Sequence, residues 1–319
     1  MPELPEVETI VRGLRGEGAS APGLLGRRVR AVHLLWPRSL AIPTEPELQA
    51  RLPGQVLQAI TRRGKFLLLH FDTDTLLVHL RMSGRLIVES PLTGMLHERQ
   101  LAVDSWQWPV ASDQMEGADP QLPAGDHQQS TINNEQSVIN IAHIRLAVDF
   151  DGGVRLVFVD PRKFGRVWLV KDPEEVVGGL GPEPLDPKLT AVEFHARLTA
   201  HRKLLKPLLL DQSFLAGLGN IYTDEALNLT RLHPCQPTQA LPYSRAEELL
   251  NSIRIILNSA IERQGASFDW VYPGGNFQNY FRAYQQTGKP CQNCGQPITR
   301  TVVGQRGTHF CPNCQLIVN

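Results

Sequence analysis

The sequence predicts an α+β protein of more than one domain, with an N-terminal β-sandwich or flattened barrel and a helical C-terminal part. Short runs rich in Val, Leu and Ile alternate with turn residues over the first half. After a turn-rich segment at residues 178–184, the apolar period becomes helical. Residues 287–319 have too few apolar side chains for a core and need another source of stability.

The first half begins with an expected helix, in which apolar residues recur at the helical spacing i, i+3, i+4 and i+7 (Val7, Ile10, Val11 and Leu14) and Gly16 and Gly18 end the pattern. Five strand-like runs follow, at 28–36, 55–60, 66–71, 75–80 and 85–88. Asp151-Gly152-Gly153 separates two alternating runs, 144–150 and 154–159, which predicts a hairpin.

Charge is distributed unevenly along a chain whose net charge is zero. Residues 89–140 hold eight acids and one base, a net charge of −7, so the remainder, with 31 bases and 24 acids, carries +7. The segment at about 90–140 is acidic, rich in Gln, Asn and Pro, and without a sustained period, which predicts an insertion between two strands. The mildly basic remainder permits a phosphate-binding face.

The second half begins after a linker at 179–188. Ser244 followed by Glu247 predicts a capping box, and an apolar stripe from Ala246 to Ile261 predicts a long helix that Gly265 ends. No apolar run reaches the roughly 18 residues of a membrane span. The acidic N-terminus is unlike a signal peptide, and five cysteines make a disulfide framework unexpected, so we expect a cytoplasmic protein.

The cysteines near the C-terminus form two C-x2-C pairs, Cys291 with Cys294 and Cys311 with Cys314, separated by sixteen residues. This spacing is typical of a four-cysteine zinc site, and a closed four-thiolate site is structural rather than catalytic. Two disulfides or a redox pair are the alternatives, which a reducing compartment disfavours. Cys235 stands apart from the pairs. The loop between them carries Arg300 and Arg306, which suit either phosphate binding or a solvated loop.

The N-terminus carries the most unusual chemistry. Removal of Met1 would expose the secondary amine of Pro2, a good nucleophile when unprotonated, at the start of a helix whose dipole disfavours a cation. Glu3 and Glu6 stand beside it and could move protons. The alternative is that Pro and Glu are ordinary residues of a first helical turn.

Other candidate residues are ambiguous when taken singly. Lys65 enters an apolar strand, Met82 lies at a turn, and Arg162 and Phe164 lie at a strand end. An apolar wedge beside cations suits a protein that unstacks DNA bases, whereas each could equally be an ordinary strand-end or core residue. Gly217-Leu-Gly-Asn220 leads into an expected helix whose free N–H groups could bind a phosphate, although a lone Gly-x-Gly is a weak signal.

Taken together and in order, these motifs resemble the formamidopyrimidine-DNA glycosylase family of bacterial 8-oxoguanine DNA glycosylases/AP lyases. The motifs are Met-Pro2-Glu3-Leu4-Pro5-Glu6, Arg63-Gly-Lys65, Met82-Ser-Gly84, Asp160-Pro-Arg-Lys-Phe-Gly165, Leu180-Gly-Pro-Glu-Pro184, Gly217-Leu-Gly-Asn220-Ile-Tyr222 and the cysteine pairs. Leu4 favours this branch over the sister endonuclease VIII group. The resemblance covers nearly the whole chain outside about 90–140.

The resemblance implies a role for each motif. Pro2 would attack C1′ of the damaged nucleotide and form a Schiff base, with Glu3 as acid/base and Lys65 assisting at a nearby phosphate. Glu6 would lie near the lesion pocket. Residues expected to fill the gap left by the flipped base, or to bind the DNA backbone, are Met82, Arg162, Phe164, Lys206, Asn220, Tyr222 and Arg306.

The implied architecture has four parts. These are a catalytic β-sandwich domain with the catalytic helix (1–178), a linker (179–188), a helix-two-turn-helix domain with a lesion-capping loop (189–286, loop about 272–284) and a zinc finger (287–319). Double-stranded DNA containing oxidised bases would lie between the domains of a monomer. Base excision would be followed by β,δ-elimination. One structural zinc and no redox or nucleotide cofactor are expected, because neither a P-loop nor an HExxH motif is present.

Two departures from the family pattern leave alternatives open. Asp269 stands where the family often has a base, and the acidic insertion is atypical. A paralogue that prefers oxidised pyrimidines is the first alternative. A non-catalytic DNA-damage binder on the same scaffold is the second, and the intact Pro2, Glu3 and Lys65 argue against it. A nonspecific zinc-ribbon DNA-binding protein explains only the C-terminus.

Overall fold

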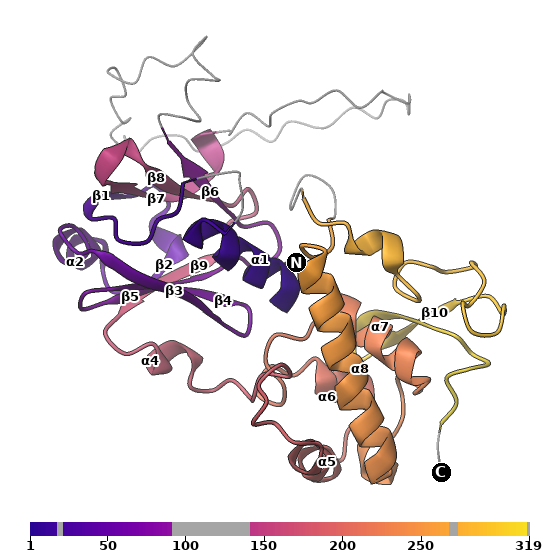
Figure 1. Ribbon diagram of the computed structural model, residues 1–319. Coiled ribbons are helices and arrows are strands. Elements are labelled where there is room, and N and C mark those ends of the chain that lie inside the picture. Colours follow the sequence, from indigo (N-terminus) through magenta and orange to yellow (C-terminus); the bar gives the residue numbers. More distant parts are fainter. Residues whose placement is uncertain (18–21, 91–140, 268–273, 318–319) are drawn as a thin grey trace, which may run out of the picture.

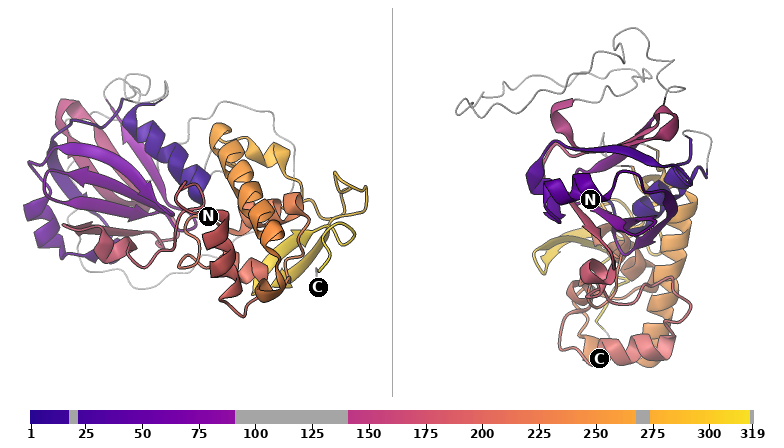
Figure 2. Two further views of the ribbon diagram at one scale, coloured as in Figure 1. Left: turned by 60° about the horizontal axis from the view of Figure 1, so that its bottom comes forward. Right: turned by 90° about the vertical axis from the view of Figure 1, so that its left-hand side faces the viewer.

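The computed structural model describes residues 1–17, 22–90, 141–267 and 274–317. It consists of a β-rich N-terminal lobe and a helical C-terminal lobe (Figure 1). Figure 1 and the left view of Figure 2 place the N-terminus of the chain at the junction of the two lobes. The predicted acidic insertion and Asp269 lie outside the described residues.

The N-terminal lobe is a sandwich of two open sheets, of order β1-β7-β8-β6 and β2-β9-β5-β4-β3. Neighbouring strands are antiparallel, except for the parallel pair β2 and β9. The sheets do not close on each other, so of the two predicted forms the sandwich is confirmed. The strands are β1 (Val29–Leu34), β2 (Leu40–Ile42), β3 (Leu57–Arg63), β4 (Phe66–Phe71), β5 (Thr75–His79), β6 (Arg85–Glu89), β7 (Ile144–Phe150), β8 (Arg155–Val159) and β9 (Arg166–Val170).

Two of these strands have no counterpart among the sequence predictions. β2 is three residues long and takes its place only by pairing with β9, so no local period reveals it. β9 directly follows the turn of the Asp160–Gly165 motif. The predicted hairpin through Asp151-Gly152-Gly153 is confirmed, because β7 and β8 pair on either side of it.

The core of this lobe lies between the two sheets and is closed by helix α1 (Leu4–Arg15) and the short helix α2 (Glu45–Arg51). Alternate residues of each strand point inward, such as Leu67 and Leu69 of β4 and Leu146 and Val148 of β7. The outer face of the five-stranded sheet packs against helix α4 (Glu174–Val177) through Leu77 and Val177.

The C-terminal lobe packs its helices around a single apolar core. They are α5 (Ala191–Thr199), α6 (Leu205–Leu209), α7 (Asn220–Thr230) and α8 (Tyr243–Glu262). The zinc module follows, with the antiparallel hairpin of β10 (Thr299–Val303) and β11 (Arg306–Phe310). Short 3-10 turns complete the described structure, at Pro37–Ser39, Ile141–His143, Asp151–Gly153, Thr238–Ala240 and Phe277–Tyr280.

Both predicted ends of the long helix α8 need correction. Its N-cap is Pro242, with no side-chain capping bond, so Ser244 lies inside the first turn and forms no capping box. At the other end Gln264 takes the left-handed conformation, with φ 60°. The amides of Gln264 and Gly265 bond back to Ile261 and Ala260, which is a Schellman ending with Gln in the position usually held by Gly.

Helix α1 joins the two lobes because its apolar face contributes to both cores. Leu4, at its first turn, belongs to the core of the helical lobe, whereas Val7 and Val11 belong to the core of the sandwich. The helix ends at Gly16, as predicted, in the left-handed conformation. The start of α1 is therefore fixed in space by both lobes.

A second junction holds the linker against the turn between β3 and β4. The Arg62 guanidinium donates two hydrogen bonds of 2.8 Å to the Glu183 carboxylate and one of 3.2 Å to Glu8 of α1. Arg63 donates to the carbonyl oxygens of Leu180 and Gly181. These two arginines are thus occupied within the protein.

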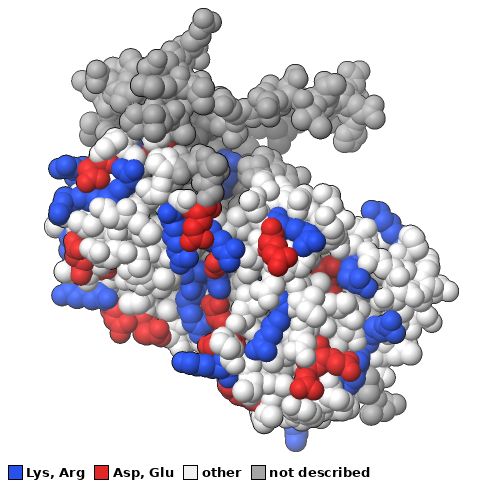
Figure 3. Space-filling view, in the orientation of Figure 1, with Lys and Arg blue, Asp and Glu red and all other residues white. Residues whose placement is uncertain are grey.

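Acidic and basic side chains lie close together along the boundary of the lobes on the face shown in Figure 3, so this face carries no field of one sign. Among the described residues, no helix combines the length and the hydropathy needed to cross a membrane.

Candidate active site

The candidate active site lies where the first turn of α1 meets the start of α7. Pro2 is buried, and Met1, which precedes it, is 48% exposed. The Glu3 carboxylate is 3% exposed and accepts a 3.0 Å hydrogen bond at Oε1 from the backbone N–H of Ile221. The anion at the start of α7 is therefore a carboxylate of the same chain, where the sequence suggested a phosphate.

Glu3 titrates near neutrality in this position. Burial raises its pKa to about 7, although Lys65 and the Ile221 amide favour the charged form. Its Oε2 is buried and has no hydrogen-bond partner among the described residues. A carboxyl with a pKa near the working pH can both donate and accept a proton, as acid/base catalysis requires.

Lys65 follows the β3–β4 turn and points to the same junction. Its side chain is 6% exposed, and Nζ donates a 2.9 Å hydrogen bond to the carbonyl oxygen of Leu218. Burial lowers the Lys65 pKa, an effect that the neighbouring Glu3 and Glu6 oppose. A lysine held this way is a cation placed beside a titrating acid.

Two glycines allow α1 to approach the loop before α7. A Cβ on Gly219 would lie 2.2 Å from Cδ of Glu3, and a Cβ on Gly217 would lie 2.7 Å from Cδ1 of Leu4. Gly217 also has φ 91°. The Gly-x-Gly motif that was a weak signal in the sequence therefore makes room for helix α1.

Glu6 connects this site to the end of α8. Its Oε2 accepts a 2.8 Å bond from the Glu3 amide, and its Oε1 accepts from the Tyr222 hydroxyl and, at 2.8 Å, from the Ala266 amide. Tyr222 is fully buried, so the predicted DNA contact of Tyr222 does not fit its position. The hydroxyl instead ties α7 to α1.

The predicted DNA probes Met82, Arg162 and Phe164 lie on two adjacent turns. Met82 is 45% exposed and Phe164 50% exposed, an unusual exposure for large apolar side chains. The Arg162 guanidinium lies over the Phe164 ring, 5.3 Å from its centroid. These side chains are therefore exposed to solvent rather than packed in the core.

The buried carboxylate of Asp160 ties these two turns together. It accepts hydrogen bonds from the Ser83 hydroxyl next to Met82 and from the amides of Arg162 and Gly165. Asp160 is fully buried. Because one carboxylate binds both turns, the exposed side chains that they carry have a fixed relative position.

The four cysteines of the C-terminal module fit a zinc ion. Their Sγ atoms all lie within 4.8 Å of one another, with Cys294–Cys311 at 3.5 Å and Cys291–Cys314 at 4.0 Å. Four thiolates at the usual Zn–S distance of about 2.3 Å lie about 3.8 Å apart in a tetrahedron. The protein thus carries one structural zinc site, as predicted.

A buried carboxylate of α7 helps to hold the zinc module in place. The buried Asp224 accepts a 2.6 Å bond from Lys206 Nζ and a 2.9 Å bond from the His309 amide. Lys206 also donates to the carbonyl oxygen of Gly307 at 3.0 Å. The predicted DNA contact of Lys206 needs correction, because this ammonium is fully buried and paired inside the protein.

Asn220 and Arg306 meet at the same point. Asn220 Nδ2 donates a 3.1 Å hydrogen bond to the Gly307 carbonyl, next to the exposed Arg306 at the start of β11. The buried Oδ1 of Asn220 has no partner among the described residues. Asn220 and Arg306 are thus brought together from segments far apart in the sequence.

Sequence reasoning missed the structural acids of this site, Asp160, Asp224 and Glu225. The Glu225 carboxylate is fully buried and accepts hydrogen bonds from the backbone amides of Arg282, Ala283 and Tyr284. For Asp224 and Glu225, the available signal was that these two adjacent acids are the charged residues of the otherwise uncharged run 212–230. A helix buried on all sides needs partners for such groups.

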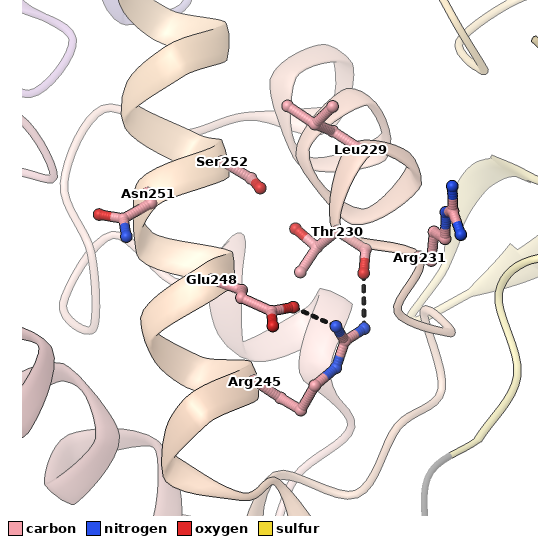
Figure 4. Close-up of a pocket in the computed structure, with 7 residues that line it drawn as sticks. All are labelled: Leu229, Thr230, Arg231, Arg245, Glu248, Asn251 and Ser252. Carbon is pink, nitrogen blue, oxygen red and sulfur yellow. Dashed lines mark hydrogen bonds and ion pairs between the residues drawn. The ribbon is translucent and has the colours of Figure 1, made fainter. Parts of the chain in front are cut away.

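A separate hollow of about 490 Å³ lies between α7 and α8 (Figure 4). Arg245 bridges it by bonding to Glu248 and to the carbonyl oxygen of Thr230. The hollow shares no lining residue with the candidate active site.

Family sequence models match three parts of the chain. The Formamidopyrimidine-DNA glycosylase N-terminal domain matches residues 1–167, and the Formamidopyrimidine-DNA glycosylase H2TH domain matches residues 180–270. The zinc finger found in FPG and IleRS matches residues 288–317.

Full-length relatives agree with these matches. A formamidopyrimidine-DNA glycosylase of Chloroflexus aggregans is 38% identical over the whole of both chains. Wild-type Lactococcus lactis Fpg (MutM) with DNA containing N7-benzyl-Fapy-dG is 30% identical, with a TM-score of 0.77 over 98% of this chain and 99% of that one. The same protein with DNA containing an oxidised pyrimidine is 31% identical, with a TM-score of 0.76 and the same coverage. The chain belongs to the formamidopyrimidine-DNA glycosylase family.

Proposed function

We propose that this protein excises oxidised purines, 8-oxoguanine and formamidopyrimidines, from duplex DNA and then cleaves the strand as an AP lyase. The observation that carries the proposal is the convergence of Pro2, Glu3 and Lys65 at one buried junction of a chain in this family. Glycosylases that also cleave the strand need an amine nucleophile and an acid/base group side by side.

The chemistry begins at the Pro2 nitrogen, once Met1 is removed. The secondary amine loses its proton and attacks C1′ of the damaged nucleotide, and the bond to the base breaks. The C1′–O4′ bond then breaks as O4′ takes a proton, which opens the sugar ring and leaves a cationic iminium. The iminium acidifies the C2′ proton, so elimination of the phosphates follows base loss. Glu3, with a pKa of about 7, supplies a proton during sugar-ring opening and removes one during elimination. Lys65 assists at the neighbouring phosphate.

The remaining predicted residues bind the DNA around this centre. Met82 and Phe164 fill the gap left by the flipped nucleotide, and Arg162 probes the opposite cytosine. Asn220 and Arg306 bind the backbone phosphates, which makes affinity salt-dependent. Lys206 and Tyr222 act from inside the protein, by positioning β11 and α1.

The four cysteines flank the hairpin of β10 and β11, and a zinc ion bound to them would tie the two ends of this hairpin together. The closed set of four thiolates leaves no open coordination position, so the ion supplies stability rather than a reaction step. Its loss removes the support of Arg306 and thereby weakens DNA binding.

A preference for oxidised pyrimidines is the second candidate function. It is favoured by the Lactococcus lactis Fpg complex with DNA that contains an oxidised pyrimidine. Turnover on thymine glycol far above that on 8-oxoguanine would support this candidate against the first.

Borohydride trapping on an 8-oxoguanine:cytosine duplex tests the proposed function. We expect a covalent adduct from the protein with Met1 removed and none from a form that keeps Met1, because acylation blocks the Pro2 nitrogen. Pro2→Gly keeps an N-terminal amine and should trap weakly. Tight lesion binding without any adduct would show that the protein is a damage binder and not an enzyme.

A further inference from the structure

The turn that carries Arg162 and Phe164 contains a residue whose contact the proposed mechanism does not use. Lys163 lies between the two probes in the left-handed conformation, with φ 60°. This conformation costs free energy for a residue other than glycine, and such strain is retained where the surroundings impose it. The Lys163 side chain is exposed, so burial does not impose it.

The contact that accompanies this conformation is with Trp36. Lys163 Nζ lies 4.0 Å from the centroid of the Trp36 ring, within the range of a cation–π interaction. Arg38 approaches the same ring at 5.9 Å. The Lys163 ammonium, which projects from the turn, thus packs over the face of the Trp36 indole.

Trp36 is itself fixed to the base of the same turn. Its amide donates a 3.2 Å hydrogen bond to the carbonyl oxygen of Arg145. The Arg145 guanidinium, in a side chain 3% exposed, donates at 2.8 Å to the carbonyl oxygen of Asp160, the first residue of the turn. Trp36 therefore contacts the middle of the turn through its ring and is linked to the start through its backbone.

We propose that Trp36 is a positioning residue that sets the conformation of the 160–165 turn and thereby the selectivity for the base opposite the lesion. The inference rests on the proposed function, because it assumes that Arg162 and Phe164 probe the opposite base. Trp36 acts through Lys163 and is not a catalytic residue. Asp160 holds the backbone of the turn, and without the ring the left-handed conformation of Lys163 within it is less populated, so the two probes are directed less precisely.

Two substitutions at this position separate the ring face from bulk alone. Trp36→Leu removes the π face and keeps an apolar side chain, whereas Trp36→Phe keeps a π face. The measurement is the ratio of kcat/KM for 8-oxoguanine opposite cytosine to that opposite adenine. We expect Trp36→Leu to lower this ratio about three- to five-fold, the effect of losing an exposed cation–π contact, and Trp36→Phe to restore most of it.

Cleavage of a preformed abasic site is the control reaction, because it needs the Pro2 chemistry but no opposite-base discrimination by the turn; it should stay unchanged in both variants. Arg38→Met, which removes the more distant cation, should leave the ratio within about twofold. Equal ratios in wild type and Trp36→Leu, or a loss that Trp36→Phe does not rescue, would overturn the inference. A wild-type protein that excises no lesion would overturn the proposed function instead.

Discussion

Glu3 keeps a pKa near neutrality although it faces a helix N-terminus and a lysine. Both neighbours favour the carboxylate, but desolvation is the largest effect and raises the pKa to about 7. The unpartnered Oε2 agrees with this balance, because one oxygen of a buried carboxylate stays without a donor. The ionised Glu3 carboxylate therefore costs the folded protein free energy, and in the proposed mechanism the same raised pKa suits Glu3 to acid/base chemistry.

The raised pKa of Glu3 predicts that Glu3→Gln stabilises the folded protein, by an amount that depends on pH. Because the folded pKa of about 7 is above the ordinary 4.5, this group contributes stability that is full below pH 4.5 and lost as the pH rises through 7. At pH 8 the neutral amide should therefore raise the free energy of unfolding by roughly 3 kcal/mol, and at pH 4 by about zero. Urea unfolding at the two pH values measures the difference.

Excision by this variant should fall by a factor of about 100 or more, the usual contribution of an acid/base group. A Glu3→Gln protein that is no more stable than wild type at pH 8 would contradict the raised pKa.

The close approach of Gly219 to Glu3 predicts that a side chain at position 219 lowers activity. In Gly219→Ala the new Cβ would lie 2.2 Å from Cδ of Glu3, so the carboxyl must move away from the Ile221 amide. We expect a loss of about 100-fold in kcat, the effect of a misplacement of about 1 Å in an active site. Single-turnover excision measures it.

The matched control is Gly179→Ala, where a Cβ meets nothing within 4 Å. Equal activity of the two alanine variants would show that the position of Glu3 does not depend on Gly219.

At the scale of elements, α7 connects the catalytic helix to the zinc module. Its first turn binds Glu3 through Ile221, and its second turn binds Lys206 and His309 through Asp224. Glu225 holds the chain that leads from the end of α8 to the zinc module. The helix is buried along most of its length, which explains why it lacks a clear polar face.

Lys206→Met tests how much the contact between Lys206, Asp224 and the zinc module stabilises the protein. Burial lowers the Lys206 pKa while Asp224 opposes the effect, so the ammonium depends on its partner. Removing it leaves the buried Asp224 carboxylate without its ammonium partner, although the His309 contacts remain, and we expect a loss of about 3–5 kcal/mol in the free energy of unfolding. Chemical denaturation measures this loss, and zinc release to a chelator should become faster.

Lys203→Met is the control from the same region. Lys203 pairs with Asp211 at 3.2 Å, but its side chain is 50% exposed. A surface pair of this kind contributes about 0–1 kcal/mol. Similar losses in the two variants would contradict the structural role of Lys206.

For the whole molecule, the relative position of the lobes depends on α1 and on the linker contact. Leu4 belongs to one core and Val7 to the other, so α1 crosses between them. Arg62, whose side chain is 9% exposed, bonds to both α1 and the linker. Pro2, the proposed nucleophile at the start of α1, is therefore placed by contacts from both lobes.

Arg62→Met should loosen this junction. The variant leaves Glu8 and Glu183 without a shared cation, and we expect a loss of about 3 kcal/mol in stability together with a higher KM for lesion DNA. Arg12→Met removes a different partner of Glu8. Because the Arg12 side chain is 46% exposed, this variant should lose about 0–1 kcal/mol in the free energy of unfolding. Thermal melting and steady-state kinetics compare the two, and equal effects would contradict the junction role of Arg62.

Much of the fold was predictable because its signals are local. The helical period of Val7 to Leu14 and the turn at Asp151-Gly152-Gly153 each depend on neighbouring residues. The zinc site was predictable because each C-x2-C turn fixes two ligands by itself. By contrast, β2 forms only through its pairing with β9, and the start of α8 is set by Pro242 rather than by the Ser244–Glu247 pattern.

The sequence alone determined which reactive groups the chain possesses: a proline directly after Met1, adjacent acids and four paired cysteines. The tertiary structure decided what each group is able to do. Lys206 and Tyr222 lie inside, while Met82 and Phe164 are exposed, and no local pattern distinguishes them. Burial raises the Glu3 pKa to about 7 against the opposing effects of Lys65 and of the Ile221 amide, 218 positions away in the chain. The physical reason is desolvation, which depends on every segment that packs against a group and not on its neighbours in the sequence.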